Sequence, residues 1–531
     1  MNRKILVIRF SSLGDIILSS PTVLNLKIGY PQSHITFLTK PKYRQIVKMF
    51  GTVDEIALLP ESGKFTEQLL LLKYLEQQNF DIIVDLHGNF RSSLARTVLT
   101  SGQKVVYPRN RSARQRIVRF KDFPATNSNS HTHTHTIDKY NDCLQQLGLP
   151  APARRPVFQK SNGRIAAEQP TVVIAAGAAF RNKQWPVEKF AEVAIKLHHS
   201  HQAKIIWAAT EKDETPASLK EQIPEDKLSL LSNHPIAELA SIISEATITI
   251  ANDSGIAHLS SAVGTPVISI FGPTHPALGF EPRGLLDEII QADVSCRPCS
   301  LHGDKACFQK EQYCFTQIEP PEVIKKAGRL IAMRSKMAKA LFVDRDGTVI
   351  VDKPFDSNPD NIEFENGSIE ALNKATELGF KLIIVTNQSG VARGYFGIDK
   401  MKKFNAALKQ KLAEENIKID AIEYCPHYPS GSVAEYSFRC DCRKPAGGMA
   451  EKAALKHNID LRKSYVIGDK LDDLNLGRVI GAGHFLVLTG QGNENSQRLS
   501  EDRDEGRNLI CDNLLAAIMK IETLENHFVH Y

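Results

Sequence analysis

The sequence predicts an α/β protein built from several domains. Short apolar runs typical of buried strands alternate with amphipathic helical stretches along most of the chain. The chain has 531 residues, whereas a single hydrophobic core rarely serves more than about 300 residues. Its 42% hydrophobic and 24% charged residues are ordinary values for a globular protein. We therefore expect about two to four α/β domains.

The clearest strand patterns precede residue 335. They are Lys4–Phe10, His34–Leu38, Asp81–Asp85, Thr171–Ala175, Lys204–Ala208, Thr247–Ile250 and Val267–Phe271. A linker-like region near residues 150–163 separates two α/β halves, and a basic helix at Pro321–Lys339 precedes the next strand. We therefore place three domains at residues 1–160, 161–335 and 338–531.

The N-terminus enters a predicted strand directly, without the layout of a signal peptide, and no apolar run reaches about 18 residues. We therefore expect a cytoplasmic protein with no transmembrane segment. The net charge of +6 is mild for this length. One segment, Pro108–Lys121, carries six cations and no acid. Because no basic face or aromatic platform continues this segment, it predicts a local anion site and no nucleic-acid partner.

Metal-binding residue types gather in three places. The segment Asn127–Thr136 contains alternating histidines, which suit either a metal site or a mobile loop, and the lack of a second cluster favours the loop. The nine cysteines are mostly clustered, which in a cytosolic protein indicates metal binding before disulfides. The first cluster comprises Cys296, Cys299, Cys307 and Cys314. Its spacing is loose and His302 competes as a ligand, so a metal site and reduced loop cysteines are both open alternatives.

The second cysteine cluster has tighter spacing. Cys425-x-His427 and Cys440-x-Cys442 supply three thiolates and one imidazole, a complete tetrahedral set for structural zinc. They flank a loop that contains proline and glycine but has no core of its own, and a metal would hold such a loop in place. A coincidental grouping of four side chains is the alternative.

The stretch "LFVDRDGTV" (Leu341–Val349) places Asp344 and Asp346 directly after a predicted strand. In open α/β sheets, the loops at the carboxyl ends of the strands hold the site. A hydroxyl, a lysine and a further carboxylate follow downstream near other predicted strands, and they are Thr386, Lys444 and Asp469. An isolated Asp-x-Asp is commonly a solvated acidic loop, but all four features in this order argue for phosphate chemistry.

This order of residues resembles the haloacid dehalogenase superfamily of phosphatases. The Cys-x-His and Cys-x-Cys insert that runs into Cys-Arg-Lys-Pro, together with "TNQSGVARGYF" (Thr386–Phe396), resembles the D-glycero-D-manno-heptose 1,7-bisphosphate 7-phosphatases and the related histidinol-phosphatases. The resemblance covers nearly all of residues 338–495. It implies a haloacid-dehalogenase-type Rossmannoid domain with a zinc-binding loop, and heptose 1,7-bisphosphate as the substrate.

The resemblance also implies a role for each residue of the motif. Asp344 attacks phosphorus and forms an aspartyl-phosphate, while Asp346 serves as general acid and then as general base. Mg²⁺ is held by Asp344, the backbone carbonyl of Asp346 and Asp469. Thr386 and Lys444 stabilise the transferring phosphoryl oxygens.

Other residues are carried over from the same resemblance. Arg443, Arg393 and Asn387 are expected to contact the phosphosugar, and Asp473 is either an outer metal ligand or a helix cap. One departure is Ile350, where family members often carry Asn. This departure leaves the finer substrate preference open.

The first half of the chain begins with a strand, a loop of small residues and a helix start, "RFSSLGDIILSSP" (Arg9–Pro21). Gly14 permits a tight turn, and Asp15 lies at or near the N-terminus of the following helix. Capping of that helix would be a sufficient reason for the carboxylate if the motif stood alone.

Two later segments repeat this layout. Ala175–Pro186 contains Lys183 before a proline-opened helix, and Ala251–Pro276 starts a helix at Ser254 and Gly255. Helix N-termini with exposed N–H groups bind phosphate, and a lysine adds positive charge. Because neither Gly-x-Gly-x-x-Gly nor a Walker A sequence is present, a dinucleotide or ATP fold fits poorly.

Together these segments resemble glycosyltransferase family 9, the lipopolysaccharide heptosyltransferases, over nearly all of residues 1–333. The resemblance implies two facing Rossmann-like domains (GT-B) with the site in the cleft, an ADP-heptose donor, inversion of the anomeric centre and no metal. Asp15 matches the general base and Lys183 the phosphate-binding lysine. Glu214 is expected near the ribose. The nucleotide loop is matched by Asp253, Ser254, Gly255 and His258.

The acceptor side of the cleft is expected to include Asp85–Ser92 and Arg109–Lys121. Their cations suit a phosphorylated, carboxylated lipopolysaccharide core sugar at the surface of the inner membrane. The sequence therefore predicts a bifunctional enzyme of heptose metabolism, cytoplasmic and peripheral to the membrane. Two alternatives stay open: a first half that only binds sugar nucleotide, and a second half that is a histidinol-phosphatase.

Overall fold

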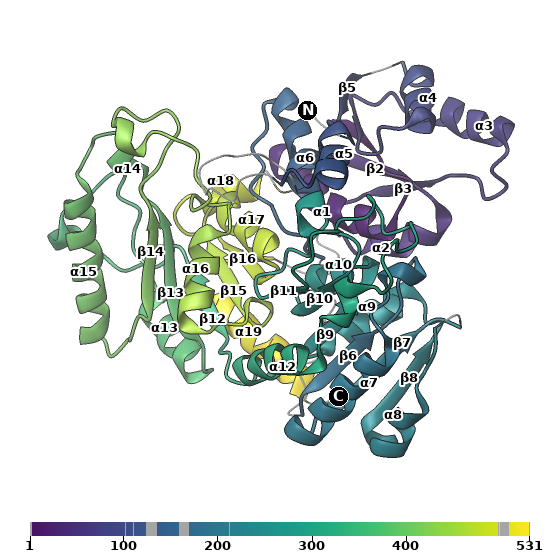
Figure 1. Ribbon diagram of the computed structural model, residues 1–531. Helices are drawn as coiled ribbons and strands as arrows, with labels where there is room; N and C mark the ends of the chain where they lie inside the picture. Colours follow the sequence, from purple (N-terminus) through teal and green to yellow (C-terminus); the bar gives the residue numbers. More distant parts are fainter. Residues whose placement is uncertain are drawn as a thin grey trace. The chain divides into compact units, whose positions relative to one another are not determined.

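Three β-sheets organise the chain, and every pair of neighbouring strands in them runs parallel (Figure 1). The protein divides into two units, Met1–Ser335 (unit 1) and Lys336–Tyr531 (unit 2). The computed structural model describes residues 3–100, 102–109, 111–123, 135–158, 169–211, 213–497, 499 and 509–529. Because helices cover both faces of a parallel sheet, its central strands are apolar and buried.

The first sheet of unit 1 has the strand order β3-β2-β1-β4-β5. Its strands are β1 (Lys4–Ile8), β2 (His34–Thr39), β3 (Glu55–Leu58), β4 (Ile82–Asp85) and β5 (Gln103–Val106). The helices of this half are α1 (Leu13–Gly29), α2 (Arg44–Lys48), α3 (Phe65–Glu76), α4 (Phe90–Val98), α5 (Arg111–Phe120) and α6 (Thr136–Asp142). The order reverses at β1, and such switch points hold ligands beyond the carboxyl ends of the strands.

The second sheet of unit 1 has the order β11-β10-β9-β6-β7-β8. Its strands are β6 (Thr171–Ala175), β7 (Lys204–Ala209), β8 (Leu228–Ser232), β9 (Ile248–Asn252), β10 (Val267–Phe271) and β11 (Glu288–Gln291). Its helices are α7 (Val187–His201), α8 (Ala217–Gln222), α9 (Ile236–Glu245), α10 (Gly255–Ala262), α11 (Tyr313–Thr316) and α12 (Pro320–Arg334). The loops after β6 and β9, at the switch point, carry Lys183 and Asp253.

The two halves of unit 1 share a buried apolar cluster. It includes Ile16 and Ile17 of α1 together with Val173 of β6 and Leu259 of α10. A second cluster fills the other face of the second sheet around Trp185. Unit 1 therefore has the paired α/β architecture that the sequence predicts.

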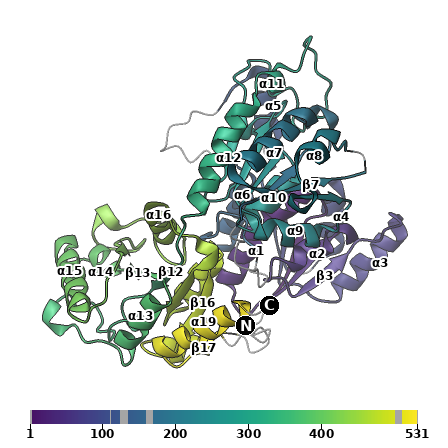
Figure 2. The ribbon, with the colours of Figure 1, turned by 90° about the horizontal axis from the view of Figure 1, so that it is seen from below.

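The sheet of unit 2 has the order β14-β13-β12-β15-β16-β17. Its strands are β12 (Ala340–Val343), β13 (Lys381–Asn387), β14 (Ala421–Cys425), β15 (Tyr465–Gly468), β16 (Gly483–Val487) and β17 (Ile510–Cys511). Its helices are α13 (Ser368–Glu377), α14 (Ser389–Ala392), α15 (Ile398–Glu414), α16 (Gly448–His457), α17 (Leu471–Ile480), α18 (Gly492–Ser496) and α19 (Leu514–Val529). Figure 2 shows α13 and α19 packed side by side against this sheet. The switch point lies between β12 and β15.

All strands named from the sequence form, with ends within two residues of the prediction. The predicted basic helix Pro321–Lys339 is shorter, because α12 ends at Arg334 and the chain then pairs at Ala338 with Ile459 before β12 begins. The predicted boundary at residue 160 lies outside the described residues. So do His131 and His133 of the histidine-rich segment. No helix in the described ranges is long and apolar enough to cross a membrane.

Candidate active sites

Asp344 follows directly on β12, at the centre of the sheet of unit 2, and is buried. The ammonium group of Lys444 lies 2.8 Å from its Oδ1 and 2.5 Å from Oδ1 of Asp473. Burial alone would raise the pKa of Asp344, but Lys444 and Lys470 outweigh it and hold that pKa below its usual value. Asp344 is therefore an ionised carboxylate, as a nucleophile requires.

Asp346 is oriented by three side chains. Arg345 Nε lies 3.0 Å from its Oδ1, Gln388 Nε2 donates to its Oδ2 at 3.0 Å, and Thr386 Oγ1 donates to the same oxygen at 3.5 Å. Thr386 is predicted from the sequence, whereas Arg345 and Gln388 are not. Both adjoin named positions, in Asp-Arg-Asp and Thr-Asn-Gln, and their side-chain directions depend on the fold. The arrangement fixes a carboxyl group beside the nucleophile, where proton transfer is needed.

The predicted magnesium ligands converge on one point. The ammonium group of Lys470 lies 3.7 Å from Asp344 Oδ2, 3.3 Å from Asp469 Oδ1 and 3.4 Å from the backbone oxygen of Asp346. Carboxylate oxygens of Asp344, Asp469 and Asp473 also lie within 4.8 Å of one another. Hard oxygen donors around one point suit Mg²⁺.

The electrostatics of this cluster favour a cation. Burial and the charge of Asp344 raise the pKa of Asp469 to about 6, and burial raises the pKa of Asp473 to about 7. Only glycine fits at position 347 beside these carboxylates. Its φ is +83°, and an added Cβ would lie 2.5 Å from Asp469 Oδ2. The residues therefore fit Mg²⁺, which when bound would offset repulsion between carboxylates and phosphate. Asp473 also accepts from the backbone N–H of Lys470 at the start of α17, so it caps this helix as well.

The residues expected at the phosphosugar divide into two groups. Asn387 accepts from the backbone N–H of Lys444 at 3.0 Å and donates to its carbonyl oxygen at 3.2 Å, so Asn387 holds the lysine loop. Arg393 and Arg443 lie over the ring of Tyr428, with guanidinium carbons 4.0 and 5.3 Å from its centroid. The two guanidinium groups therefore gather at one aromatic ring beside the loop of Lys444.

Cys425, His427, Cys440 and Cys442 form the second group of potential metal ligands. The Sγ atoms lie 3.5 Å apart for Cys425 and Cys440, 3.3 Å for Cys425 and Cys442, and 3.1 Å for Cys440 and Cys442. Nδ1 of His427 lies 3.2 Å from the Sγ of Cys442. Ligands about 2.3 Å from a tetrahedral zinc ion lie ~3.8 Å from one another. The donors and their spacing therefore suit zinc, and the loop leads directly into Arg443 and Lys444.

In unit 1, the two carboxylate oxygens of Asp15 have different partners. One oxygen takes part in capping α1, and the other contacts Arg9 and Tyr140. The cap of α1 is Ser12, whose backbone N–H and hydroxyl donate to Asp15 Oδ2 at 3.1 and 2.8 Å. The other oxygen, Oδ1, lies 2.8 Å from Arg9 and accepts from the hydroxyl of Tyr140 at 3.3 Å. Burial would raise the pKa of Asp15, but Arg9 and Ser12 bring it below its usual value. The carboxylate is thus ionised and more than a cap.

The predicted nucleotide residues lie together at the ends of β6 and β9. Lys183 Nζ lies 2.6 Å from Asp253 Oδ2, which also accepts from Thr274 Oγ1 at 2.6 Å. Ser254 precedes α10, and its buried Oγ has no hydrogen-bond partner within the described part of the chain. The same holds for Nδ1 of His258, whose pKa burial lowers to about 4. Unpartnered buried polar atoms beside a lysine and a helix N-terminus fit a bound phosphate group.

The Asp15 loop and the nucleotide loop are in contact. A Cβ on Gly14 would lie 2.8 Å from Cδ2 of His258, and a Cβ on Gly255 would lie 2.7 Å from Leu13. The general-base candidate and the phosphate-binding candidates therefore lie on loops that meet where the two halves of unit 1 contact each other. Backbone can approach this closely only where glycine stands.

Glu214 is exposed, on the loop after β7. Its neighbour Asp213 faces the cleft loops instead, since its carboxylate accepts from Gln184 Nε2 at 3.2 Å and lies against Gly177. Asp213 also accepts from the backbone N–H of Thr210 at 2.8 Å. The sequence could not separate two adjacent acids on a loop, because either can turn inward.

The four cysteines from Cys296 to Cys314 lie near one another but do not form a tight ligand group. Burial raises the pKa of Cys314, and the nearby Cys299, Cys296 and Cys307 raise it further. The described residues contain two groups with ligand atoms within 4.8 Å of one another, and these cysteines are in neither. Their loop is held by the buried Arg297, which donates to the carbonyl oxygens of Thr274 and Ala292.

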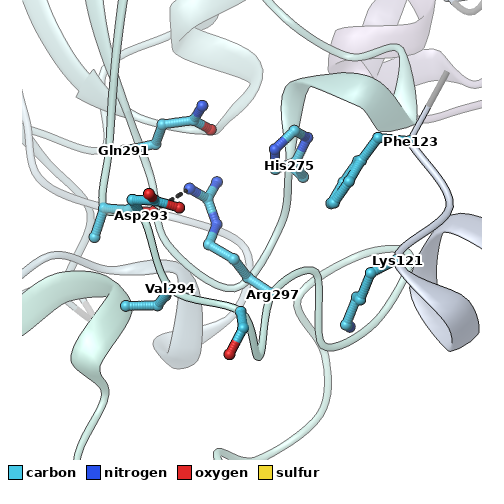
Figure 3. Close-up of a pocket in the computed structure, with 9 residues that line it drawn as sticks. Lys121, Phe123, His275, Gln291, Asp293, Val294 and Arg297 are labelled. Carbon is cyan, nitrogen blue, oxygen red and sulfur yellow. Dashed lines mark hydrogen bonds between the residues drawn. The ribbon is translucent and has the colours of Figure 1, made fainter. Parts of the chain in front are cut away.

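The basic segment forms α5 and ends beside a cavity of about 350 Å³ (Figure 3). Figure 3 shows the rings of Phe123 and His275 beside one another on one side of it. The nearest cations are already used, since Lys121 donates to the carbonyl oxygen of Pro298 at 2.6 Å and Arg297 to backbone oxygens. Lys121, at the end of the segment predicted on the acceptor side, lines this cavity, whereas Asp15, Lys183 and Asp253 do not, so the cavity is not the predicted donor site.

Comparisons with known proteins support the families predicted for unit 1 and unit 2. The model of glycosyltransferase family 9 (heptosyltransferase) matches residues 69–307, and the HAD-hydrolase-like model matches residues 441–517. D-glycero-beta-D-manno-heptose-1,7-bisphosphate 7-phosphatases from Yersinia pestis and Pasteurella multocida are each 43% identical, over 153 and 181 residues. These alignments cover 29% and 34% of this chain and 81% and 94% of those proteins.

A solved glycosyl transferase family 9 structure from Veillonella parvula has a TM-score of 0.50 and 19% identity to this chain. The match covers 62% of this chain and 98% of that chain, which supports the fold of unit 1. The chain therefore belongs, through unit 2, to the D-glycero-beta-D-manno-heptose-1,7-bisphosphate 7-phosphatase family, and residues 69–307 of unit 1 match glycosyltransferase family 9 (heptosyltransferase).

Proposed function

We propose that unit 2 hydrolyses the 7-phosphate of D-glycero-β-D-manno-heptose 1,7-bisphosphate. Asp344 attacks phosphorus, and the bond from phosphorus to the O7 oxygen of the sugar breaks as Asp346 protonates that oxygen. Water, deprotonated by Asp346, then hydrolyses the aspartyl-phosphate. Lys444 and Thr386 face the phosphoryl oxygens. Asp344, Asp469 and the Asp346 carbonyl would hold Mg²⁺, which would offset charge repulsion between the carboxylates and the phosphate. The β anomer is the substrate named in the relatives of unit 2.

Unit 1 transfers heptose from ADP-heptose to an inner-core lipopolysaccharide acceptor, with inversion. Asp15 takes the proton of the acceptor hydroxyl as its oxygen bonds to the anomeric carbon and ADP departs. Lys183, Ser254 and the N-terminus of α10 receive the diphosphate, which supplies the partners that the buried Ser254 and His258 atoms lack. The acceptor reaches the cleft from the cytoplasmic surface of the inner membrane, where the protein is peripherally bound.

One observation carries the phosphatase proposal: the buried Asp344, Lys444 and Asp469 and the half-buried Asp346 gather at the switch point of the sheet in unit 2. A side-by-side phosphate-release assay tests the substrate, using both anomers of heptose 1,7-bisphosphate and histidinol phosphate with the full chain and Mg²⁺. We expect the β anomer to give the highest kcat/KM. A preference for histidinol phosphate would replace this proposal with the histidinol-phosphatase alternative.

The transferase proposal rests on the contact between the loop of Asp15 and the loop of the phosphate-binding candidates. Transfer of labelled heptose from ADP-heptose to a lipopolysaccharide core acceptor tests it directly. Nucleotide binding without transfer to any core acceptor would instead favour a unit 1 that only binds sugar nucleotide.

The zinc assignment predicts that Cys440→Ser loses bound zinc and most phosphate release. The ligand set would fall to three, and the loop that carries Arg443 and Lys444 would loosen although the Mg²⁺ ligands stay complete. Zinc content by mass spectrometry and phosphate release would be measured together. Cys511→Ser makes the same exchange at a thiol of unit 2 that belongs to neither group of potential metal ligands, so it should change neither. A fully active, zinc-free Cys440→Ser enzyme would refute the assignment.

A further inference from the structure

Two exposed aromatic residues of unit 2 have no role in the sites described above. The rings of Phe355 and Tyr395 meet edge to face, with centroids 4.4 Å apart and planes inclined by 64°. The residues nevertheless remain 49% and 59% exposed. An aromatic pair usually contributes to stability through burial, which is largely absent here. The outer surfaces of both rings are therefore available to a ligand.

The backbone of Phe355 is strained. Its φ is +59°, in the left-handed region that glycine and asparagine tolerate and bulky side chains rarely adopt. A loop that needed only this turn would be more stable with glycine. Strained residues of this kind cluster at ligand-binding sites, where the side chain rather than the turn is needed.

Both rings stand on loops that leave the phosphatase site. Phe355 follows Asp352, whose carboxylate lies 3.8 Å from the Lys470 ammonium group, and Lys470 lies 3.7 Å from Asp344. The Phe355 loop leaves β12 and the Tyr395 loop leaves β13, the two strands that carry Asp344 and Thr386. The aromatic pair therefore joins the two loops at the rim of the site.

The same rim carries positive charge. Arg393, two residues before Tyr395, lies over the Tyr428 ring, and Arg443 approaches that ring as well. Guanidinium groups bind phosphate whatever it is attached to, so they cannot select the sugar. Selection requires a surface that distinguishes a sugar from other phosphate esters. The C–H face of a sugar is apolar and slightly positive, and it packs well on aromatic rings.

We propose that Phe355 and Tyr395 form a platform for the C–H face of the sugar, and thereby determine specificity for a phosphosugar. This proposal rests on the proposed function of unit 2. In this arrangement the two arginines bind the phosphate that is not hydrolysed. The rings hold the sugar between that phosphate and Asp344, and they take no part in proton or phosphoryl transfer.

The test uses Phe355→Gly and Tyr395→Ala in the full chain, with Leu455→Ala on α16 as a control that is also 59% exposed. We would measure kcat and KM for heptose 1,7-bisphosphate and for p-nitrophenyl phosphate, and the thermal midpoint of unfolding. Both ring variants should raise KM for the bisphosphate about tenfold and change kcat less than about threefold. Hydrolysis of p-nitrophenyl phosphate should stay within about twofold. Phe355→Gly should not lower the thermal midpoint, because glycine relieves the strained φ.

The possible outcomes separate this proposal from the one on which it rests. If the wild-type chain hydrolyses p-nitrophenyl phosphate but not heptose bisphosphate, the proposed function is wrong, and the proposal of an aromatic platform is then wrong too. If the wild type is active and both ring variants keep KM within twofold, only the platform is overturned. Equal losses on both substrates with a lower thermal midpoint would show a structural role, and would overturn it as well.

Discussion

An Asp344→Asn enzyme is expected to release phosphate from heptose 1,7-bisphosphate several orders of magnitude more slowly than wild type, while heptose transfer stays within about twofold. Asparagine keeps the size of the side chain but cannot form the aspartyl-phosphate, and loss of a covalent nucleophile has effects of this order. The fold should tolerate the change, because Lys444 keeps Asp473 at 2.5 Å as a partner for its buried charge. Both activities would be measured on the same full-length preparation.

Transferase activity should not respond to Asp344→Asn, because its buried clusters and predicted site residues all belong to unit 1. Independent sites rarely couple. Chelation by EDTA should produce the same split, since only the phosphatase is expected to use Mg²⁺. Asp360→Asn, the same exchange at an exposed position of unit 2, is the matched control and should alter neither activity. Loss of transfer in Asp344→Asn or in EDTA would mean that the units are coupled or that unit 1 needs a metal.

An Asp15→Ala enzyme is expected to lose transfer by at least about 10²-fold, the usual contribution of a general base, with ADP-heptose affinity near normal. The carboxylate acts on the acceptor, whereas Lys183 and Ser254 serve the donor. Transfer kinetics and donor binding by calorimetry would be compared. Removal of the carboxylate also deprives the buried Arg9 of its partner at 2.8 Å, so folding must be controlled.

Asp15→Asn supplies that control. It keeps the size of the side chain and one oxygen, which can accept from Ser12 or from Arg9 but not from both, because these groups donate to different oxygens of Asp15. Asparagine is not a base, so we expect Asp15→Asn to lose transfer as Asp15→Ala does, with a thermal midpoint closer to that of the wild type. If donor affinity collapses in either variant and transfer recovers at high donor concentration, Asp15 only caps the helix.

How much of the fold the sequence predicts depends on where a strand lies in its sheet. The strands named for unit 1 are all interior strands, whose residues are apolar on both faces. Those not named are β3, β5, β8 and β11, which are the four sheet edges. Edge strands are covered less completely and carry polar residues, as in Gln103–Val106, so their patterns are weak.

The candidate sites show a similar division. Residues at fixed offsets after a strand, such as Asp344, Asp346 and Lys183, are predictable because the carboxyl ends of parallel strands meet at one edge. Arg345, Gln388 and Lys470 were not named, because their roles depend on side-chain direction and on partners distant in sequence. Asp213 and Glu214 illustrate the same limit. They are adjacent on a loop, where no periodic pattern indicates which of the two side chains turns inward.

The contact between Gly14 and His258 has a genetic consequence. Any amino-acid replacement at position 14 adds at least a Cβ, and that atom would lie 2.8 Å from a buried imidazole of the opposite half. No missense change of this codon is therefore conservative, since even alanine would have to displace the ring of His258 or move the two halves of unit 1 apart. At this contact between the two halves of unit 1, selection therefore has no smaller or equivalent residue to choose.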